Sequence, residues 1–280
     1  MLGPLAGLLL LSRPATTREW VVAGACLAWS AWWLAQVGGL GAQVARAAAV
    51  LLSGSFLVLT LWRPSNAVGR ALAATAGAGL ALAVWMGRLG IGWTRLLSGI
   101  SQELSVYQTA LRADWAAAGA APELADEAAG LMHASAQLFP GLLMIAGIAG
   151  IRLAWTWYHR VAVRPLGPAP APFPAFGFND QLVWGWIAAI GLALVPGSAT
   201  ARLVAANLLL VLVALYAARG LAVFRAQTGR ISAPVVIVVA LVAMFLLPFV
   251  VGGLTVLGLA DTWLDFRRRH ATPTTGGVNR

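Results

Sequence analysis

The sequence has little charge and no lysine, and both shortages restrict the class of protein. Charged residues make up 10% of the 280 positions, and only nine of them are Asp or Glu. A soluble domain carries about 25% charged residues, because its surface must face water. Since 60% of the residues are apolar and the mean hydropathy is +0.82, we expect much of the surface to face lipid.

Cysteine and histidine are also scarce. The single cysteine, Cys26, stands in an apolar run, which excludes an intrachain disulfide and a thiolate metal cluster. The three histidines, His133, His159 and His270, are not at metal-ligand spacing, and there is no phosphate-binding loop, nucleophile elbow or zinc-protease motif. We therefore predict no catalytic residue, no metal site and no cofactor, and we do not expect an enzyme.

All nineteen basic residues are arginines, and the net charge is +10. Such a balance suggests nucleic acid as a partner, but the arginines stand singly between apolar runs and no nucleic-acid-binding motif accompanies them. Their scatter is typical of cytoplasmic loops between membrane spans. We therefore expect the lipid bilayer as a partner, and no nucleic acid.

Apolar runs predict the membrane spans. A helix needs about 20 mostly apolar residues to cross a bilayer, and no alternation of period two indicates strands. The clearest runs are 20–36, 43–62, 67–86, 138–158, 181–195 and 202–224. Together with two further segments, they predict an all-α, polytopic transmembrane helix bundle of about eight membrane segments.

Those two further segments leave the number of spans open. Residues 1–11 are too short to cross comfortably, so they form a re-entrant helix, a frayed helix or a tilted short span. Residues 233–264 would form a helix roughly 48 Å long, which exceeds a hydrocarbon core of about 30 Å. Pro248, Gly252 and Gly253 lie in its middle, so we predict two short spans joined by a turn near 249–253. One long kinked helix is the alternative.

The distribution of the arginines predicts how the bundle is oriented in the membrane. If the arginines at 267–269 are cytoplasmic, the two-span interpretation places twelve arginines inside and five outside. A single final helix would reverse every earlier loop and weaken this asymmetry. We therefore expect a protein of the cytoplasmic (inner) membrane with a cytoplasmic C-terminus.

Residues 91–137 differ from the spans because they hold five of the nine acidic residues. Apolar residues recur there at helical spacing: Leu97, Ile100, Leu104, Tyr107 and Leu111, then Leu124, Ala128, Leu131 and Leu138. Between the two sets, an Ala/Gly-rich turn at 116–121 precedes Pro122 and Glu123, which are typical of a first helical turn. We predict an external amphipathic helical hairpin that serves as a lid, as a docking surface or only as a connector resting on lipid.

Composition also divides the chain into parts. Alternating prolines prevent a helix across residues 163–178. The expected parts are N-terminal membrane helices (1–90), the external hairpin (91–137), a membrane helix (138–161), a Pro-rich cytoplasmic linker (162–178), C-terminal membrane helices (179–266) and a basic, disordered cytoplasmic tail (267–280).

Polar groups at membrane depth are costly, so they are the first candidates for a ligand site. Arg152 is a candidate for binding an anionic group, although snorkelling toward the headgroups is the interpretation that we favour. Asn207 would bind a solute or, as we prefer, hydrogen-bond a neighbouring helix. Asp180 either binds a ligand or, as our first choice, caps the helix that follows it.

Four other residues are candidates for packing or interface roles. Gly147 and Gly150 permit close approach between helices. Asp261 and Asp265 precede the arginine cluster, and Asp265 has the helical spacing to pair with an arginine at 268 or 269.

Short motifs in the C-terminal half carry a family resemblance. They are Phe173-Pro174-Ala175-Phe176, Asp180-Gln181-Leu182-Val183-Trp184, Asn207-Leu208-Leu209, Leu215-Tyr216, Arg219-Gly220-Leu221-Ala222 and the stretch 258–267. On these residues, about 138–269 of the chain resembles the YybS-like uncharacterised bacterial predicted membrane proteins. It is more remotely similar to the substrate-binding S components of energy-coupling-factor transporters and to small shape-determining envelope proteins.

The resemblance implies two functions of different classes. The first is a subunit that binds or transports a small-molecule ligand in a cavity opening outward beneath the hairpin. Because the sequence has no nucleotide-binding motif, such a subunit would need an energising membrane protein partner or an ion gradient. The alternative is a scaffold for cell-envelope partners, which predicts a bundle without a solute-sized cavity. We favour the first.

Overall fold

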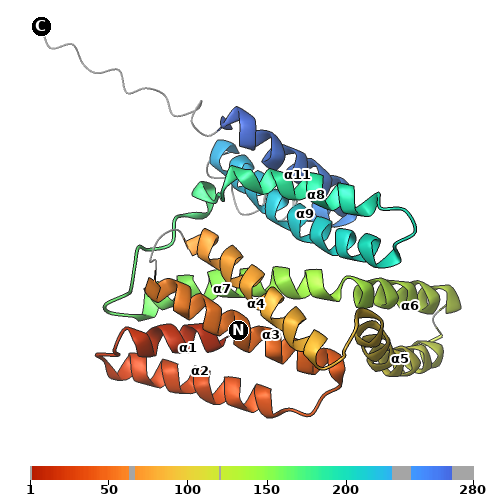
Figure 1. The fold of residues 1–280 in the computed structure, drawn as a ribbon, viewed down its shortest axis with the longest axis horizontal. Helices are drawn as coiled ribbons and strands as arrows, with labels where there is room; N and C mark the ends of the chain where they lie inside the picture. The colour runs from red at the N-terminus through yellow and green to blue at the C-terminus, as the bar shows by residue number, and fades with distance from the viewer. Residues whose placement is uncertain (1, 63–66, 120, 229–240, 267–280) are drawn as a thin grey trace, which may run out of the picture. The chain divides into compact units, whose positions relative to one another are not determined.

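The computed structural model describes residues 2–62, 67–119, 121–228 and 241–266 (Figure 1). Every regular element in these ranges is a helix and none is a strand, which confirms the predicted all-α fold. The chain divides into two compact units, Met1–Pro170 with Leu192–Asn207, and Ala171–Gly191 with Leu208–Arg280. The boundary runs through one long helix, α9 (Ala199–Thr228).

The first unit is a bundle of apolar helices. They are α1 (Leu2–Leu11), α2 (Thr17–Ala35), α3 (Leu40–Trp62), α4 (Ala67–Arg88) and α7 (Phe139–Val161). The helix α1 packs against α2, α3 and α7, while α4 packs against α3 and α7. The largest side chains of their common core are Phe56, Trp155 and Tyr158, all at most 1% exposed. Burial of these rings holds α3 and α7 together.

The helix α1 is short but lies in the core. Its Leu8 and Leu9 are 0% exposed, although ten residues rise only about 15 Å, half of the hydrocarbon core. The chain then reverses at Arg13, whose φ is 55°, and continues into α2. Burial of these leucines argues against the frayed helix among the three forms considered for residues 1–11.

Residues 91–137 form the predicted helical hairpin. Its helices, α5 (Trp93–Ala117) and α6 (Pro122–Gln137), pack against each other. An ion pair joins them, with Arg112 Nη2 at 2.9 Å from Asp126 Oδ1. At the turn, Gly119 has a φ of 71°, a conformation that glycine adopts without a steric penalty.

The inward face of the hairpin differs in part from the predicted stripe. Ile100 is buried, but Tyr107, Leu124 and Leu131 are between 51% and 71% exposed. Glu103 lies off the apolar stripe, yet it accepts a hydrogen bond at 2.9 Å from the backbone N–H of Gly41 in α3. An N–H in the first turn of a helix has no partner within that helix, so the carboxylate satisfies it and turns this face of α5 inward.

The second unit begins at Ala171, inside the Pro-rich segment. Residues 162–178, all described, contain no α-helix, as predicted, and only the 3-10 turn η1 (Phe173–Ala175). The turn η2 (Asp180–Val183) leads into α8 (Trp184–Ala193), which precedes α9 and α11 (Leu247–Leu264). The α-helical part of the expected span 181–195 is therefore only ten residues long, because its first turn is 3-10.

The turn predicted near 249–253 is wrong. These residues lie inside α11, and the described interruption is at Leu246, after the helical residues 241–245. Pro248 occupies the first turn of α11, where the absent N–H breaks no bond within that helix. The remainder of the predicted pair of spans falls on 229–240, which lie outside the described residues.

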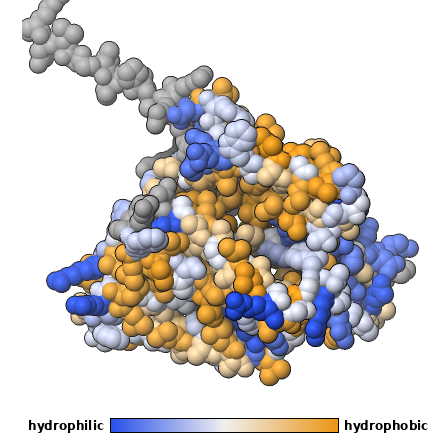
Figure 2. All heavy atoms as spheres, viewed as in Figure 1, coloured by the Kyte–Doolittle hydropathy of each residue, from blue (hydrophilic) through white to orange (hydrophobic). Residues whose placement is uncertain are grey.

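Five described helices are long and apolar enough to cross a membrane, namely α3, α4, α7, α9 and α11. The expected segments in α1, α2 and α8 are not among them, so the predicted count of eight is not confirmed. Large apolar side chains remain exposed, such as Trp29 at 58% and Leu61 at 59%. Figure 2 shows such apolar surface between hydrophilic groups. This surface is typical of a membrane protein in contact with lipid.

Candidate functional site

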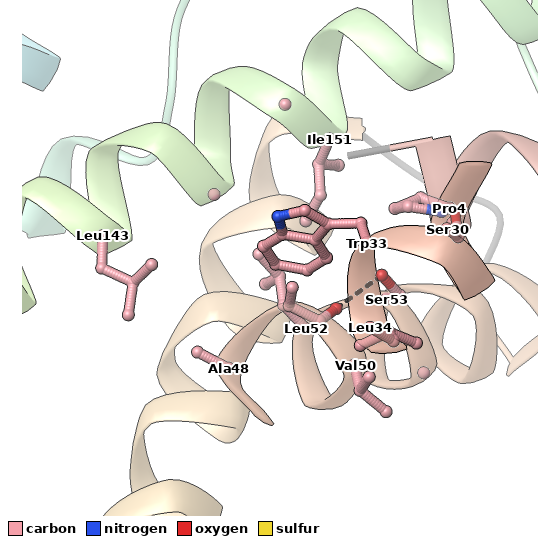
Figure 3. A pocket seen from close by; sticks show the side chains of 15 residues that line it. Pro4, Ser30, Trp33, Leu34, Ala48, Val50, Leu52, Ser53, Leu143 and Ile151 are labelled. Atoms are coloured by element: carbon pink, nitrogen blue, oxygen red, sulfur yellow. Dashed lines mark hydrogen bonds between the residues drawn. The ribbon is translucent and has the colours of Figure 1, made fainter. Parts of the chain in front are cut away.

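A cavity of about 350 Å³ lies in the first unit. Its walls come from the start of α1, the last turns of α2, the middle of α3 and one face of α7 (Figure 3). The lining residues are Gly3, Pro4, Ser30, Trp33, Leu34, Ala48, Ala49, Val50, Leu52, Ser53, Gly54, Leu143, Gly147, Gly150 and Ile151. Small-molecule sites begin at about 300 Å³, so the cavity is large enough for a small solute.

The cavity offers few polar groups. Ser30 Oγ donates to Cys26 O at 2.7 Å. Ser53 Oγ donates to Ala49 O at 2.6 Å (Figure 3). With their protons engaged in their own helices, both hydroxyls present only oxygen lone pairs to a ligand. Trp33 adds an aromatic face. Since no lining residue is charged, the site suits a neutral and mostly apolar solute.

Gly147 and Gly150 lie in the α7 wall of this cavity. A Cβ at Gly147 would come within 2.6 Å of Leu52 Cδ2 on α3, so this position holds α7 close to α3. That agrees with the expected packing role. Because neither glycine has a side chain, both also keep the cavity wide at this wall. Their spacing in the sequence did not indicate this second role.

The position of the cavity departs from the one expected. No residue of the hairpin 91–137 lines it, whereas we predicted a cavity beneath the hairpin. The reason is that Glu103 and Ile100 attach α5 to the start of α3, away from the residues of α3 that line the cavity. The hairpin is therefore no wall of this site.

Asn207 joins helices, as preferred. Its Oδ1 accepts from Gly141 N at 2.7 Å, and its Nδ2 donates to Gln137 O and Leu203 O, both at 2.9 Å. Gln137 ends α6 and Gly141 lies in the first turn of α7, so one amide satisfies backbone groups on both sides of this break. All three hydrogen bonds join the Asn207 side chain to backbone atoms of this chain.

Two of the candidate residues, Asp180 and Asp261, meet at Arg219 in the second unit. Arg219 Nε donates to Asp261 Oδ2 at 2.9 Å, and Arg219 Nη1 donates to Asp180 Oδ1 at 2.6 Å. The side chains of Arg219 and Asp261 are 7% and 0% exposed, while that of Asp180 is 61% exposed. The Arg219 guanidinium also lies 5.5 Å from the centre of the Phe178 ring. This network links η2, α9 and α11.

The capping role expected for Asp180 belongs to its neighbour. Asn179 is the N-cap of η2, and its side chain accepts from Gln181 N at 3.0 Å. Asp180 is the first residue of that turn and reaches Arg219 instead. The capping interpretation was wrong because both residue types are good N-caps and the chain enters the turn one residue earlier.

The other two candidates stand apart from these groups. Arg152 is half-buried on α7 and follows Ile151, but it is not part of the cavity lining. Asp265 ends α11 with a φ of 41°, and its N–H donates to Asp261 O at 3.2 Å. The arginines expected to pair with it, at 268 and 269, lie outside the described residues.

Sequence reasoning missed a carboxylate at the start of α2. Glu19 Oε2 accepts from Ala15 N, Thr16 N and Thr16 Oγ1 at 2.8–2.9 Å, and its Oε1 accepts from Val163 N at 2.8 Å. Thr16 and Glu19 form a capping box, a pattern that the sequence Thr-x-x-Glu before an apolar run already contains. The bond to Val163 attaches the start of α2 to the segment after α7.

Acidification is expected to weaken this attachment. The hydrogen bond from Val163 N, with those from residues 15 and 16, lowers the pKa of Glu19 from 4.5 to about 2. The contribution to stability is therefore complete above pH 4.5 and is lost as the pH falls from 4.5 toward 2. Thermal unfolding of detergent-purified protein across this range is the measurement. Glu19→Gln should flatten that part of the profile, and an unchanged profile would contradict this account.

The cavity lining contains no acid, base, histidine or cysteine that transfers protons or attacks a substrate. Among the residues that the structure describes, no three His, Cys, Asp or Glu side chains gather as a metal site would require. What these residues provide is a half-open, mostly apolar space lined by apolar side chains and glycines.

Comparison with known proteins gives one match. Residues 45–262, more than three quarters of the chain, match the family described as predicted membrane protein (DUF2232). No curated protein matches the chain. No solved structure matches it either. The matched region includes most of α3, the hairpin, α7, the Arg219 network and most of α11. The chain therefore belongs to the DUF2232 family of predicted membrane proteins.

Proposed function

We propose that this protein is a solute-binding or transport subunit of a bacterial cytoplasmic membrane, and that the cavity between α1, α2, α3 and α7 is its binding site. The cavity of about 350 Å³ carries this proposal. The scaffold alternative predicted a bundle without a solute-sized space. The resemblance to the YybS-like proteins and to S components adds support by analogy.

The lining sets the ligand class. Apolar side chains and glycines form most of the wall, and the two serines offer acceptor lone pairs. A charged solute would lose its hydration without gaining a counter-charge. The ligand is therefore small, neutral and mostly apolar, with a donor group placed to reach Ser30 or Ser53.

The sequence also indicates where the energy for transport would come from. It has no nucleotide-binding motif and no catalytic constellation, so the protein is not an enzyme and takes its energy from a separate subunit or an ion gradient. If residues 233–264 cross the membrane twice, the arginine asymmetry supports a cytoplasmic C-terminus and an external hairpin.

Filling the cavity is expected to remove the ligand. A Cβ at Gly3 would lie 3.5 Å from Ser53 Oγ and 4.0 Å from Ser30 Oγ, so the side chain of Gly3→Leu enters the space between the serines. We expect ligand occupancy to fall about tenfold or more, because the new side chain competes for the same volume. The measurement is native mass spectrometry of the protein, gently purified from its own membranes.

A matched variant controls for the added bulk. Gly24 lies on the exposed side of α2, has no atom within 4 Å of its Cβ position and does not line the cavity. Gly24→Leu should retain the ligand as wild type does. Wild-type protein that carries no small molecule but co-purifies with envelope proteins would contradict the proposal and favour the scaffold.

A further inference from the structure

Arg70 is a buried arginine without a hydrogen-bond partner in the described chain. It lies in the first turn of α4 and is 5% exposed. Its Nε, Nη1 and Nη2 atoms are all buried, and none donates to a described residue. An uncompensated buried charge costs far more than an exposed one.

Two aromatic rings cover the face of its guanidinium. The Cζ atom of Arg70 lies 4.5 Å from the centre of the Trp155 ring and 5.5 Å from that of Phe56. Stacking of this kind compensates part of the charge. It leaves the N–H groups unused, because they lie in the plane of the guanidinium and point away from its edge.

The described residues provide Arg70 with no acidic partner. Trp155 Nε1 is also buried and makes no hydrogen bond to a described residue. Arg70 forms no ion pair with a described acid, and the carboxylate of Glu19 already accepts four hydrogen bonds elsewhere. The Tyr158 hydroxyl accepts from Leu166 N at 2.7 Å. Arg70 and Trp155 therefore provide a positive charge and N–H donors that no described residue uses.

We propose that Arg70 and the indole N–H of Trp155 bind a phosphate group. The guanidinium fork matches two phosphate oxygens, and the indole supplies a third donor. The helix α4 begins at Ala67, so Arg70 lies about 5 Å inside the end of that span, near the level of lipid phosphates. The N-terminal turn of α4 adds partial positive charge. The phosphate belongs to a lipid headgroup or to a soluble anion.

The test uses full-length protein in a neutral detergent and two probes. One is inorganic phosphate, compared with chloride at equal ionic strength. The other is mixed micelles with phosphatidylglycerol, compared with phosphatidylcholine. Binding is followed as a rise in unfolding temperature and as adducts in native mass spectrometry. We expect Arg70→Gln to weaken phosphate binding about tenfold or more, and Trp155→Phe to weaken it several-fold.

Arg160 provides the matched control. It is exposed in the last turn of α7 and lies 5.9 Å from the centre of the Trp157 ring, so Arg160→Gln removes a similar stacked charge. That variant should respond to both probes as wild type does. Arg70→Lys keeps the charge and should retain part of the binding if Arg70→Gln folds poorly.

Each pattern of responses has one meaning. An Arg70-dependent response to both probes supports a general phosphate site, and a response to inorganic phosphate alone supports a soluble anion. A response to phosphatidylglycerol alone assigns the phosphate to the lipid headgroup. No response to either probe, or equal responses of wild type and Arg70→Gln, would overturn the proposal and leave Arg70 as a packing residue.

Discussion

Replacement of Arg219 by glutamine is expected to destabilise the protein by about 3–5 kcal/mol. The reason is the state in which it leaves Asp261, whose side chain is 0% exposed and pairs with Arg219 Nε at 2.9 Å. Without the guanidinium, a buried carboxylate loses its counter-charge while still excluded from water. Denaturant unfolding of the purified protein, followed by circular dichroism, measures the loss.

The neighbouring acids provide the controls. Asp261→Asn should cost a comparable amount, because it leaves the buried Arg219 with only its more exposed partner. Asp180 is 61% exposed, so Asp180→Asn should cost about 1 kcal/mol or less. The double variant Arg219→Gln with Asp261→Asn should lose much less than the sum of the single losses. Additive losses, or an equally large loss from Asp180→Asn, would refute the assigned roles of the two carboxylates.

Local features of this fold were predictable from sequence. The hairpin at 91–137 follows from apolar spacing, a glycine-containing turn and Pro122 at a helix start, all of which act within a few residues. The Pro-rich segment likewise prevents an α-helix by its own chemistry. Glu103 shows the limit. It lies off the apolar stripe, yet a backbone N–H of α3, 62 residues away, binds it.

The site residues show the same limit. Asp180, Arg219 and Asp261 each belong to a different motif that carries the family resemblance, but their meeting depends on how η2, α9 and α11 pack. No spacing rule connects residues 39 or 42 positions apart. Arg70 was more accessible to reasoning, because it lies inside the predicted span 67–86, where an ionisable residue is itself a signal.

Replacement of Gly258 by alanine is expected to cost about 3 kcal/mol or more. A Cβ there would overlap the carbonyl oxygen of Tyr216 on α9, and a Cβ at Gly220 would likewise overlap the carbonyl oxygen of Leu254 on α11. These atoms belong to helix backbones, which cannot rotate aside as a side chain does, so α9 and α11 must move apart. Unfolding in denaturant measures the cost, and Gly220→Ala should behave in the same way.

The same helix supplies a control for this substitution. Gly252 lies on the exposed side of α11 with no atom within 4 Å of its Cβ position, so Gly252→Ala should be neutral or stabilising. A loss there equal to that of Gly258→Ala would attribute the effect to α11 itself and not to its contact with α9.

The glycine crossing and the ion pair are also expected to depend on each other. Gly220 adjoins Arg219, and Gly258 precedes Asp261 by three residues, so separating the helices at the glycines also separates the charges. In a Gly258→Ala background, Arg219→Gln should therefore cost clearly less than in wild type. An undiminished cost would mean that the pair forms without close contact of the two backbones. A diminished cost would show that the small residues allow the buried charges to reach each other.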